Sequence, residues 1–193
     1  MKVVGLTGPI GAGKTAAAEV LKSLGAATVD ADEIVHKLLT QRRFIRAMVC
    51  RWGAEVAPRG RLDRRAVAAR VFRDDSERRF LERLVHPPVL KAIRRAVRNA
   101  RKKDKRLMVI DAPLLVETGL HKLCDAVLYI DAPRPQRLSR ARQAKGFDAQ
   151  EVLRRERAMI PLGVKRKLAD RVIRNDADRK ALARKLERFL KSL

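Results

Sequence analysis

Short apolar runs with the length of strands recur along the chain, and segments with helical spacing separate them. The first run, Val3–Leu6, contains no polar residue, as expected of a strand buried on both faces. Four further runs end in an acidic or amide residue and lie at 26–32, 107–111, 125–131 and 169–175. This alternation of strands and helices predicts an α/β domain with five strands.

The helices expected between these strands have recognisable ends. Strong helix formers follow residue 15, and Gly25 is the residue expected to end this first helix. The break Lys145–Asp148 is a candidate hinge for a lid. The other helices are predicted at 33–39, 134–142 and 149–159, with an amphipathic closing helix at 178–193.

Between Gln41 and Ala100 the apolar positions follow helical spacing only, which predicts a helical insertion. A polar turn at 58–61 and the pair Pro87-Pro88 interrupt it. Proline lacks an N–H and disfavours helical geometry in the preceding residue. We therefore expect His86 at a corner between two helices, the second beginning near Val89. A histidine at such a corner is more often a packing residue than a ligand.

Residues 8–15, Gly-Pro-Ile-Gly-Ala-Gly-Lys-Thr, fit the pattern of a phosphate-binding loop, here called the phosphate loop. Glycines let successive N–H groups point at a phosphate, and the following helix adds its unpaired N–H groups and positive partial charge. Lys14 is expected to reach the β- and γ-phosphates and Thr15 to bind Mg²⁺. The residues predicted to contact ATP here are Gly8, Ile10, Gly11, Ala12, Gly13, Lys14, Thr15 and Ala16.

Acidic residues follow two of the predicted strands at the edge where open α/β sheets bind ligands. Asp30 and Asp32 end the second run, and each is either a helix N-cap or a residue that meets the ligand of the phosphate loop. For Asp32 we favour a catalytic role. Asp111 ends an apolar strand and resembles a Walker-B acid, which binds Mg²⁺ directly or through water. The loop from Ala112 to Gly119 is expected at the same edge, beside an acceptor substrate.

Composition narrows the classes of protein that remain. The formal net charge of +24 favours polyanionic partners or substrates, whereas an aromatic content of 4% argues against a dedicated single-strand nucleic-acid binder. Many of the arginines lie along helices, where we favour a solvated face as their explanation. Cys50 and Cys124 are expected to be buried or half-buried thiols in a reducing compartment. No signal peptide or membrane-spanning run is evident, which predicts a cytoplasmic protein.

Together these landmarks resemble the dephospho-coenzyme A kinase family, within the P-loop nucleoside and nucleotide kinases, over nearly the whole chain. The phosphate loop is common to many families. Its combination with Asp30-Ala31-Asp32, His86-Pro87 and the loop 113–119 is far more specific. The remaining residues that carry the resemblance are Gly5, Leu6, Thr7, Val29, Ile34, His36, Arg64, Val71, Phe72, Leu84, Val85, Asp111, Ala112, Gln136, Arg137, Arg140, Ala169, Asp170, Ile173 and Asn175.

The resemblance implies ATP-dependent phosphorylation of the ribose 3′-hydroxyl of dephospho-coenzyme A, the last step of coenzyme A biosynthesis. It also implies a three-layer P-loop fold with a five-stranded parallel sheet. By position, Asp32 corresponds to the general base, Lys14 and Arg140 to groups that stabilise phosphate charge, and Asn175 to a residue near the adenine. The residues implied on the acceptor side are His86, Leu114 and Glu117.

The expected domain organisation is a core of residues 1–40 and 104–193, with a lid around 134–165, and a helical acceptor-binding subdomain at 41–103. Two positions depart from the family pattern. Pro9 stands where glycine is common and cannot donate a hydrogen bond, and Met159 stands where glutamine is usual.

Two other functions stay open. One is a P-loop kinase of another small molecule, such as a nucleoside or nucleoside monophosphate. The other is a nucleotide-gated nucleic-acid-binding protein, which the charge motivates.

Overall fold

The five apolar runs form one parallel sheet with the order β2-β3-β1-β4-β5 in the computed structural model, which describes residues 1–193. The predicted α/β class and the five parallel strands are therefore confirmed. β1 extends one residue beyond each end of its apolar run, and each of the other strands lies within its run. The bounds are Lys2–Thr7 for β1, Ala27–Asp30 for β2, Leu107–Asp111 for β3, Ala126–Asp131 for β4 and Arg171–Arg174 for β5.

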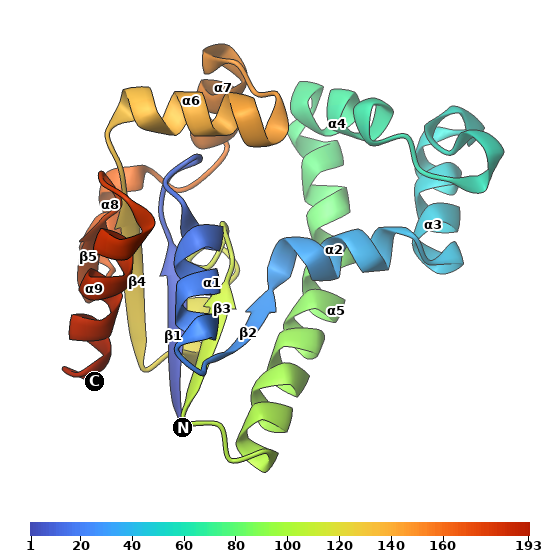
Figure 1. Cartoon of the computed structure of the whole chain (residues 1–193). Helices are drawn as coiled ribbons and strands as arrows, with labels where there is room; N and C mark the ends of the chain where they lie inside the picture. The colour runs from blue at the N-terminus through green and yellow to red at the C-terminus, as the bar shows by residue number, and fades with distance from the viewer. The chain divides into compact units, whose positions relative to one another are not determined.

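Nine α-helices connect or flank these strands (Figure 1). Short 3₁₀ turns lie at Ala54–Val56, Pro58–Gly60 and Leu120–Leu123. The helices are α1 (Lys14–Ser23), α2 (Ala31–Leu39), α3 (Arg42–Trp52), α4 (Arg64–Arg73), α5 (Asp75–Lys102), α6 (Arg134–Lys145), α7 (Ala149–Arg157), α8 (Leu162–Lys167) and α9 (Arg179–Leu190).

The chain divides into two compact units, residues 1–30 with 95–193, and residues 31–94. We call them the sheet unit and the helical unit. Their extents differ from the expected core and subdomain, because α2 groups with the helical unit and residues 95–103 group with the sheet unit. The roles expected for these parts stay predictions.

In the sheet unit, α1 and α9 lie side by side and cover one face of the sheet (Figure 1). Alternate strand residues point to this face, as the period of a strand requires. Val4 and Leu6 of β1 are fully buried there, against Leu21 of α1 and Leu186 of α9. The helices α6 and α7 pack on each other and lie over the carboxyl ends of β1 and β4, where the phosphate loop begins.

The helical unit has a small core of its own around Met48 and Trp52. The Trp52 ring meets Phe80 edge to face, with 5.5 Å between ring centroids. Its indole N–H donates to Glu77 Oε2 at 2.6 Å, and the Arg51 guanidinium pairs with the same carboxylate at 2.9 Å. Hydrogen bonds from Arg51 and Trp52 lower the pKa of the Glu77 carboxyl.

Two local predictions were wrong. The second strand ends at Asp30 and does not run on to Asp32, because α2 begins at Ala31. The helix α5 continues through Pro87 and Pro88, so no corner forms at His86. The buried positions 85, 89, 93 and 97 recur every fourth residue on both sides of the prolines. Burial of this continuous stripe offsets the hydrogen bonds that the two prolines cannot make.

The two cysteines are not paired with each other. Cys50 is exposed, contrary to expectation, because it lies on the outer face of α3. Cys124 is half-buried, and its burial raises the pKa of its thiol to about 12. The thiol is therefore neutral at physiological pH and a poor nucleophile.

None of the helices combines the length and the apolar character that crossing a bilayer requires.

Candidate functional site

The phosphate loop joins the carboxyl end of β1 to the first turn of α1, as the sequence predicts. Gly11 and Gly13 have φ angles of +75° and +91°, which side-chain-bearing residues rarely adopt. A Cβ on Gly11 would lie 2.1 Å from the carbonyl oxygen of Arg137, and one on Gly13 would lie 2.2 Å from Asn175 Nδ2. Glycine is therefore required at both positions, since α6 and the segment after β5 pack directly on the loop.

The side chain of Lys14 points back toward the start of the phosphate loop. Its Nζ donates to the carbonyl oxygens of Gly8 and Pro9, each at 2.9 Å. The first N–H groups of α1 have no acceptors within the helix, so they point out of its end together with a positive partial charge. The loop thus combines an ammonium group with a helix N-terminus, which is a site suited to phosphate.

Two charged residues from α6 and α7 hold the first half of the loop. Ile10 N–H donates to Glu156 Oε1 at 3.1 Å, and Arg137 Nη1 donates to the same oxygen at 2.7 Å. Arg137 Nη1 also lies 3.3 Å from the carbonyl oxygen of Ile10. The side chains of Arg137 and Glu156 are only 12% and 14% exposed. Both polar backbone groups of Ile10 are therefore engaged.

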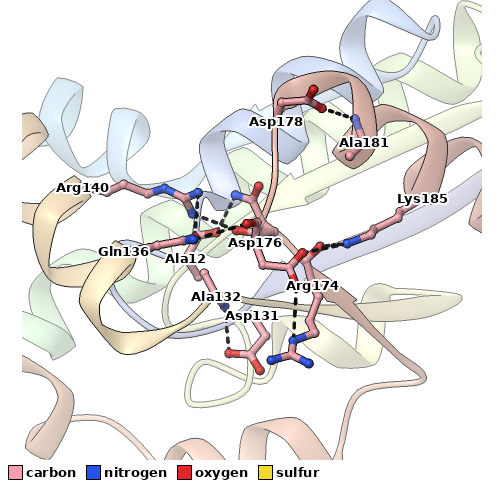
Figure 2. Close-up of polar contacts among 11 residues, drawn as sticks. Ala12, Asp131, Ala132, Gln136, Arg140, Arg174, Asp176, Asp178, Ala181 and Lys185 are labelled. Carbon is pink, nitrogen blue, oxygen red and sulfur yellow. Dashed lines mark hydrogen bonds and ion pairs between the residues drawn. The ribbon is translucent and has the colours of Figure 1, made fainter.

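The second half of the loop is held from the segment after β5 (Figure 2). Asn175 is buried and donates from Nδ2 to the carbonyl oxygen of Ala12 at 2.8 Å. Arg140 Nη1 donates to the carbonyl oxygen of Asn175 at 3.0 Å, and Arg140 Nη2 donates to Gln136 Oε1 at 3.3 Å. Gln136 Nε2 in turn donates to the carbonyl oxygen of Asp176. The structure thus brings the predicted residues Arg140 and Asn175 to the phosphate loop.

Oxygen-bearing residues lie at the adjoining edge of the sheet. Asp111 is 6% exposed and is the strand partner of both Leu6 and Asp30. Thr7 is fully buried, and its hydroxyl has no hydrogen-bond partner. No group of three or more His, Cys, Asp or Glu side chains is arranged to hold a metal ion. Asp30 and Asp111 therefore lie side by side where β2 and β3 end.

Glu117 forms an ion pair with Lys165, a residue that no sequence pattern indicated. Lys165 of α8 is fully buried, and its Nζ lies 2.6 Å from Glu117 Oε1 and 2.9 Å from the carbonyl oxygen of Pro113. The same Glu117 oxygen accepts from Ile160 N–H at 3.1 Å. Glu117 Oε2 is buried without a partner. Leu114, in the same loop, is half-buried.

Asp32 and His86 belong to the helical unit. Asp32 is exposed in the first turn of α2, two residues after the end of β2. His86 is half-buried within α5. The exposed His36 and Arg64 contact each other in this unit. The predicted site residues therefore divide between the two units.

Sequence reasoning missed two residues of the sheet unit, Glu156 and Lys165. Glu156 lies in an arginine-rich helix and Lys165 in a lysine- and arginine-rich one, so neither differs from a solvated charge by composition. The one indication for Glu156 is that it is an isolated acid between arginines. Their roles follow from contacts distant in the chain, which a local pattern does not encode.

A family model described as dephospho-CoA kinase matches residues 2–181. Among curated proteins, the dephospho-CoA kinase of Anaeromyxobacter dehalogenans is 39% identical over 195 residues, covering 100% of this chain and 92% of the relative. The dephospho-CoA kinase of Symbiobacterium thermophilum is 37% identical over 177 residues, covering 91% of this chain and 74% of the relative.

Solved structures share the fold. TT1252 from Thermus thermophilus has a TM-score of 0.81 and 33% identity, covering 100% of this chain and 97% of its own. Dephospho-CoA kinase from Campylobacter jejuni has a TM-score of 0.69 and 22% identity, covering 98% and 96%. Shikimate kinase from Acinetobacter baumannii has a TM-score of 0.59 and 18% identity, covering 100% and 94%. The last two are similar in fold alone.

Proposed function

The chain belongs to the dephospho-CoA kinase family, and we propose that it transfers the terminal phosphoryl group of ATP to the ribose 3′-hydroxyl of dephospho-CoA. The product is coenzyme A, formed in the last step of its biosynthesis. The observation that carries the proposal is the phosphate loop between β1 and α1, held on one side by Arg137 and Glu156 and on the other by Asn175.

Lys14 and Arg140 are the groups proposed to stabilise charge on the transferred phosphate. The Lys14 ammonium already lies at the mouth of the loop, where it holds two carbonyl oxygens. The Arg140 guanidinium lies close to Gly13, since its Nη1 is 3.9 Å from an ideal Cβ at that position. Phosphoryl transfer passes through a loose transition state with charge on the transferred oxygens, so two nearby cations favour it.

Asp32 is proposed as the general base that accepts the proton of the ribose hydroxyl. Its exposed position at the start of α2, next to the carboxyl end of β2, supports this role. On the acceptor side we propose His86, Leu114 and Glu117. For Glu117, the unpartnered Oε2 is the atom that a donor on the acceptor would satisfy, because Oε1 is already shared by Lys165 and Ile160.

Mg²⁺ is proposed to bind through the Thr15 hydroxyl and the Asp111 carboxylate, directly or through water. Both are oxygen donors, which Mg²⁺ prefers, and the absence of a larger acidic cluster fits an ion that keeps several waters and binds substrate phosphates. The pairing of Asp111 with Leu6 supports a position beside the start of the phosphate loop. When bound, the ion supplies charge neutralisation at the β- and γ-phosphates.

The experiment that tests the proposal is incubation of the protein with ATP, Mg²⁺ and dephospho-CoA, followed by mass analysis of the acceptor. The expected result is one added phosphate, and the Lys14→Ala variant serves as the inactive control. Phosphorylation of a nucleoside or nucleoside monophosphate in its place would contradict the acceptor. Salt-resistant, submicromolar binding of an oligonucleotide without kinase activity would favour a nucleic-acid-binding function.

The proposed location is the cytoplasm, and the proposed partners are the two small-molecule substrates. Two cysteines that do not pair with each other support a reducing compartment. The low aromatic content argues against nucleic acid as a partner.

A further inference from the structure

We propose that Glu156 is a positioning residue for ATP binding, because its carboxylate and Arg137 together hold the first half of the phosphate loop in its binding shape. The inference rests on the proposed function, since it assumes that the loop accepts the phosphates of ATP. It adds a residue of α7 that does not touch the reacting atoms and acts through the loop.

The contacts join three segments far apart in the chain. Glu156 Oε1 accepts from Ile10 N–H at 3.1 Å and from Arg137 Nη1 at 2.7 Å. Arg137 also donates to the carbonyl oxygen of Ile10, at 3.3 Å. A carboxylate and a guanidinium therefore bind the N–H and the C=O of the same loop residue. These two bonds fix the peptide groups on both sides of Ile10.

Burial strengthens the interactions of Glu156 and Arg137 with the loop. The Arg137 and Glu156 side chains are about seven-eighths buried, at 12% and 14% exposed. A sheltered ion pair is screened less by water and salt than a surface pair. Hydrogen bonds to charged groups contribute more to stability than hydrogen bonds between neutral groups. Truncation of the Glu156 side chain would leave Ile10 N–H and Arg137 Nη1 without the acceptor that they share.

The first half of the loop needs such support because of Pro9. Proline has no N–H, so Ile10 provides the first amide after Gly8 that can anchor the chain. Beyond Ile10, the close approach of Gly11 to the Arg137 carbonyl keeps α6 against the loop. The second half has a separate anchor in the bond from Asn175 to Ala12. A loop anchored before the ligand arrives loses less conformational entropy on binding.

Two substitutions separate the charge of Glu156 from its role as the hydrogen-bond acceptor of Ile10 N–H. A carboxylate near a triphosphate is unfavourable unless it is neutralised, and Arg137 neutralises Glu156. Glu156→Gln keeps an acceptor for Ile10 N–H and removes the negative charge. Glu156→Ala removes both. The inference therefore predicts that glutamine rescues the ATP affinity that alanine loses.

The test is a calorimetric titration with ATP, together with steady-state kinetics, on the full chain. For Glu156→Ala we expect the Kd and KM for ATP to rise about tenfold, the factor that corresponds to one lost hydrogen bond of about 1.4 kcal/mol. We expect kcat to change less than about threefold, since no transition-state contact is removed. Glu156→Gln is expected to stay within about threefold of the unmodified protein.

The matched control is Glu151→Ala. Glu151 lies on the same helix and pairs with Arg154 and Arg155, which are also on α7, so its loss removes ion pairs without touching the loop. Its ATP affinity is expected to be unchanged. If Glu156→Ala fails to fold, Glu156→Asp replaces it in the test. The aspartate carboxylate is one methylene shorter and does not reach Ile10 N–H, so we expect ATP binding to weaken severalfold.

Unchanged ATP affinity in Glu156→Ala, or in Glu156→Asp when the alanine variant does not fold, would overturn the inference. An equal loss of affinity in the alanine and glutamine variants, accompanied by an equal drop in thermal midpoint, would assign Glu156 a merely structural role and overturn it as well. Absence of ATP binding in the unmodified protein would instead contradict the proposed function.

Discussion

Lys165 and Glu117 form a sheltered ion pair in the sheet unit. The lysine is fully buried, and the side chain of its partner is 17% exposed. The pair connects α8 to the loop after β3, and Lys165 also holds the carbonyl oxygen of Pro113. Burial of two charges is costly, and the hydrogen bonds from Lys165 Nζ to Pro113 and from Ile160 N–H to Glu117 Oε1 offset part of that cost. The pair therefore fixes the shape of the loop that we propose for the acceptor.

Removal of Lys165 alone is predicted to destabilise the protein strongly. Lys165→Met leaves the Glu117 carboxylate without its cation, and the free energy of unfolding is expected to fall by about 3–5 kcal/mol. Lys165→Met combined with Glu117→Gln removes both charges and is expected to recover most of that loss. Urea unfolding followed by circular dichroism measures both variants. Equal stability of the single and double variants would show that the pair is not coupled.

Asp32, Lys14 and Arg140 are predicted to differ in what their loss changes. Asp32→Asn removes a general base and is expected to lower kcat by about 10²–10⁴-fold with ATP affinity nearly unchanged. Lys14→Ala and Arg140→Ala are expected to lower turnover at least as much, because stabilisation of phosphate charge contributes about 10³–10⁵-fold in related reactions. Steady-state rates and ATP titrations separate these effects. An Asp32→Asn variant with normal turnover would remove Asp32 from the mechanism.

At the scale of elements, the strands were the most predictable part of the molecule. Runs such as 107–111 are apolar at every position but the last, and only a buried strand accommodates them at that length. The phosphate loop was predictable for a similar reason, since its chemistry requires a fixed spacing of glycine, lysine and threonine. Both are local patterns, and local patterns can be read from one sequence.

The order of the strands and the contacts of α6 and α7 could not be predicted in the same way. Asp170 illustrates the reason. Its carboxylate accepts from Val127 N–H at 2.7 Å, and its own N–H donates back to Val127, so it fixes the register of β5 on β4. Asp125 does the same for β4 on β1 through Val3. Each partner lies more than 40 positions away, and the bond appears only once the sheet has formed.

Helix α5 shows why the prolines misled the prediction. The rule for proline concerns the local backbone, whereas the apolar stripe of α5 extends over the whole helix. Tertiary burial outweighed local propensity, as it often does in long helices.

The helical unit is predicted to lose stability in acid through Glu77. Hydrogen bonds lower the pKa of this carboxyl in the folded state. Its stabilising effect is therefore complete above the unfolded pKa, about 4.3, and is lost as the pH falls through the folded value. Glu77→Gln is expected to be less stable at neutral pH and less sensitive to acid.

Fluorescence of Trp52 measures this loss, because Trp52 is the only tryptophan of the chain and bonds directly to Glu77. The Asp75→Asn variant is a suitable control, since its carboxylate pairs with Arg78 at the exposed start of α5. Parallel acid transitions in the unmodified protein and in Glu77→Gln would contradict the prediction.

At the scale of the whole molecule, the net charge of +24 is the feature most open to a physical test. Excess positive charge attracts ATP and an acceptor that contains a pyrophosphate, and salt screens this attraction beyond the Debye length of about 10 Å at 0.1 M. We expect kcat/KM to fall about three- to tenfold between low salt and about 0.3 M, with kcat nearly constant. A flat profile of kcat/KM against salt would leave no role for steering.

The packing of α9 against α1 has a consequence for protein synthesis. The apolar face of α1 is completed by Leu182, Leu186 and Phe189, and Ala12 is anchored by Asn175. These residues leave the ribosome long after the phosphate loop has emerged. A nascent chain that ends before Leu190 therefore lacks part of the helix that covers α1, and we expect nucleotide affinity to reach its full value only after translation has passed α9.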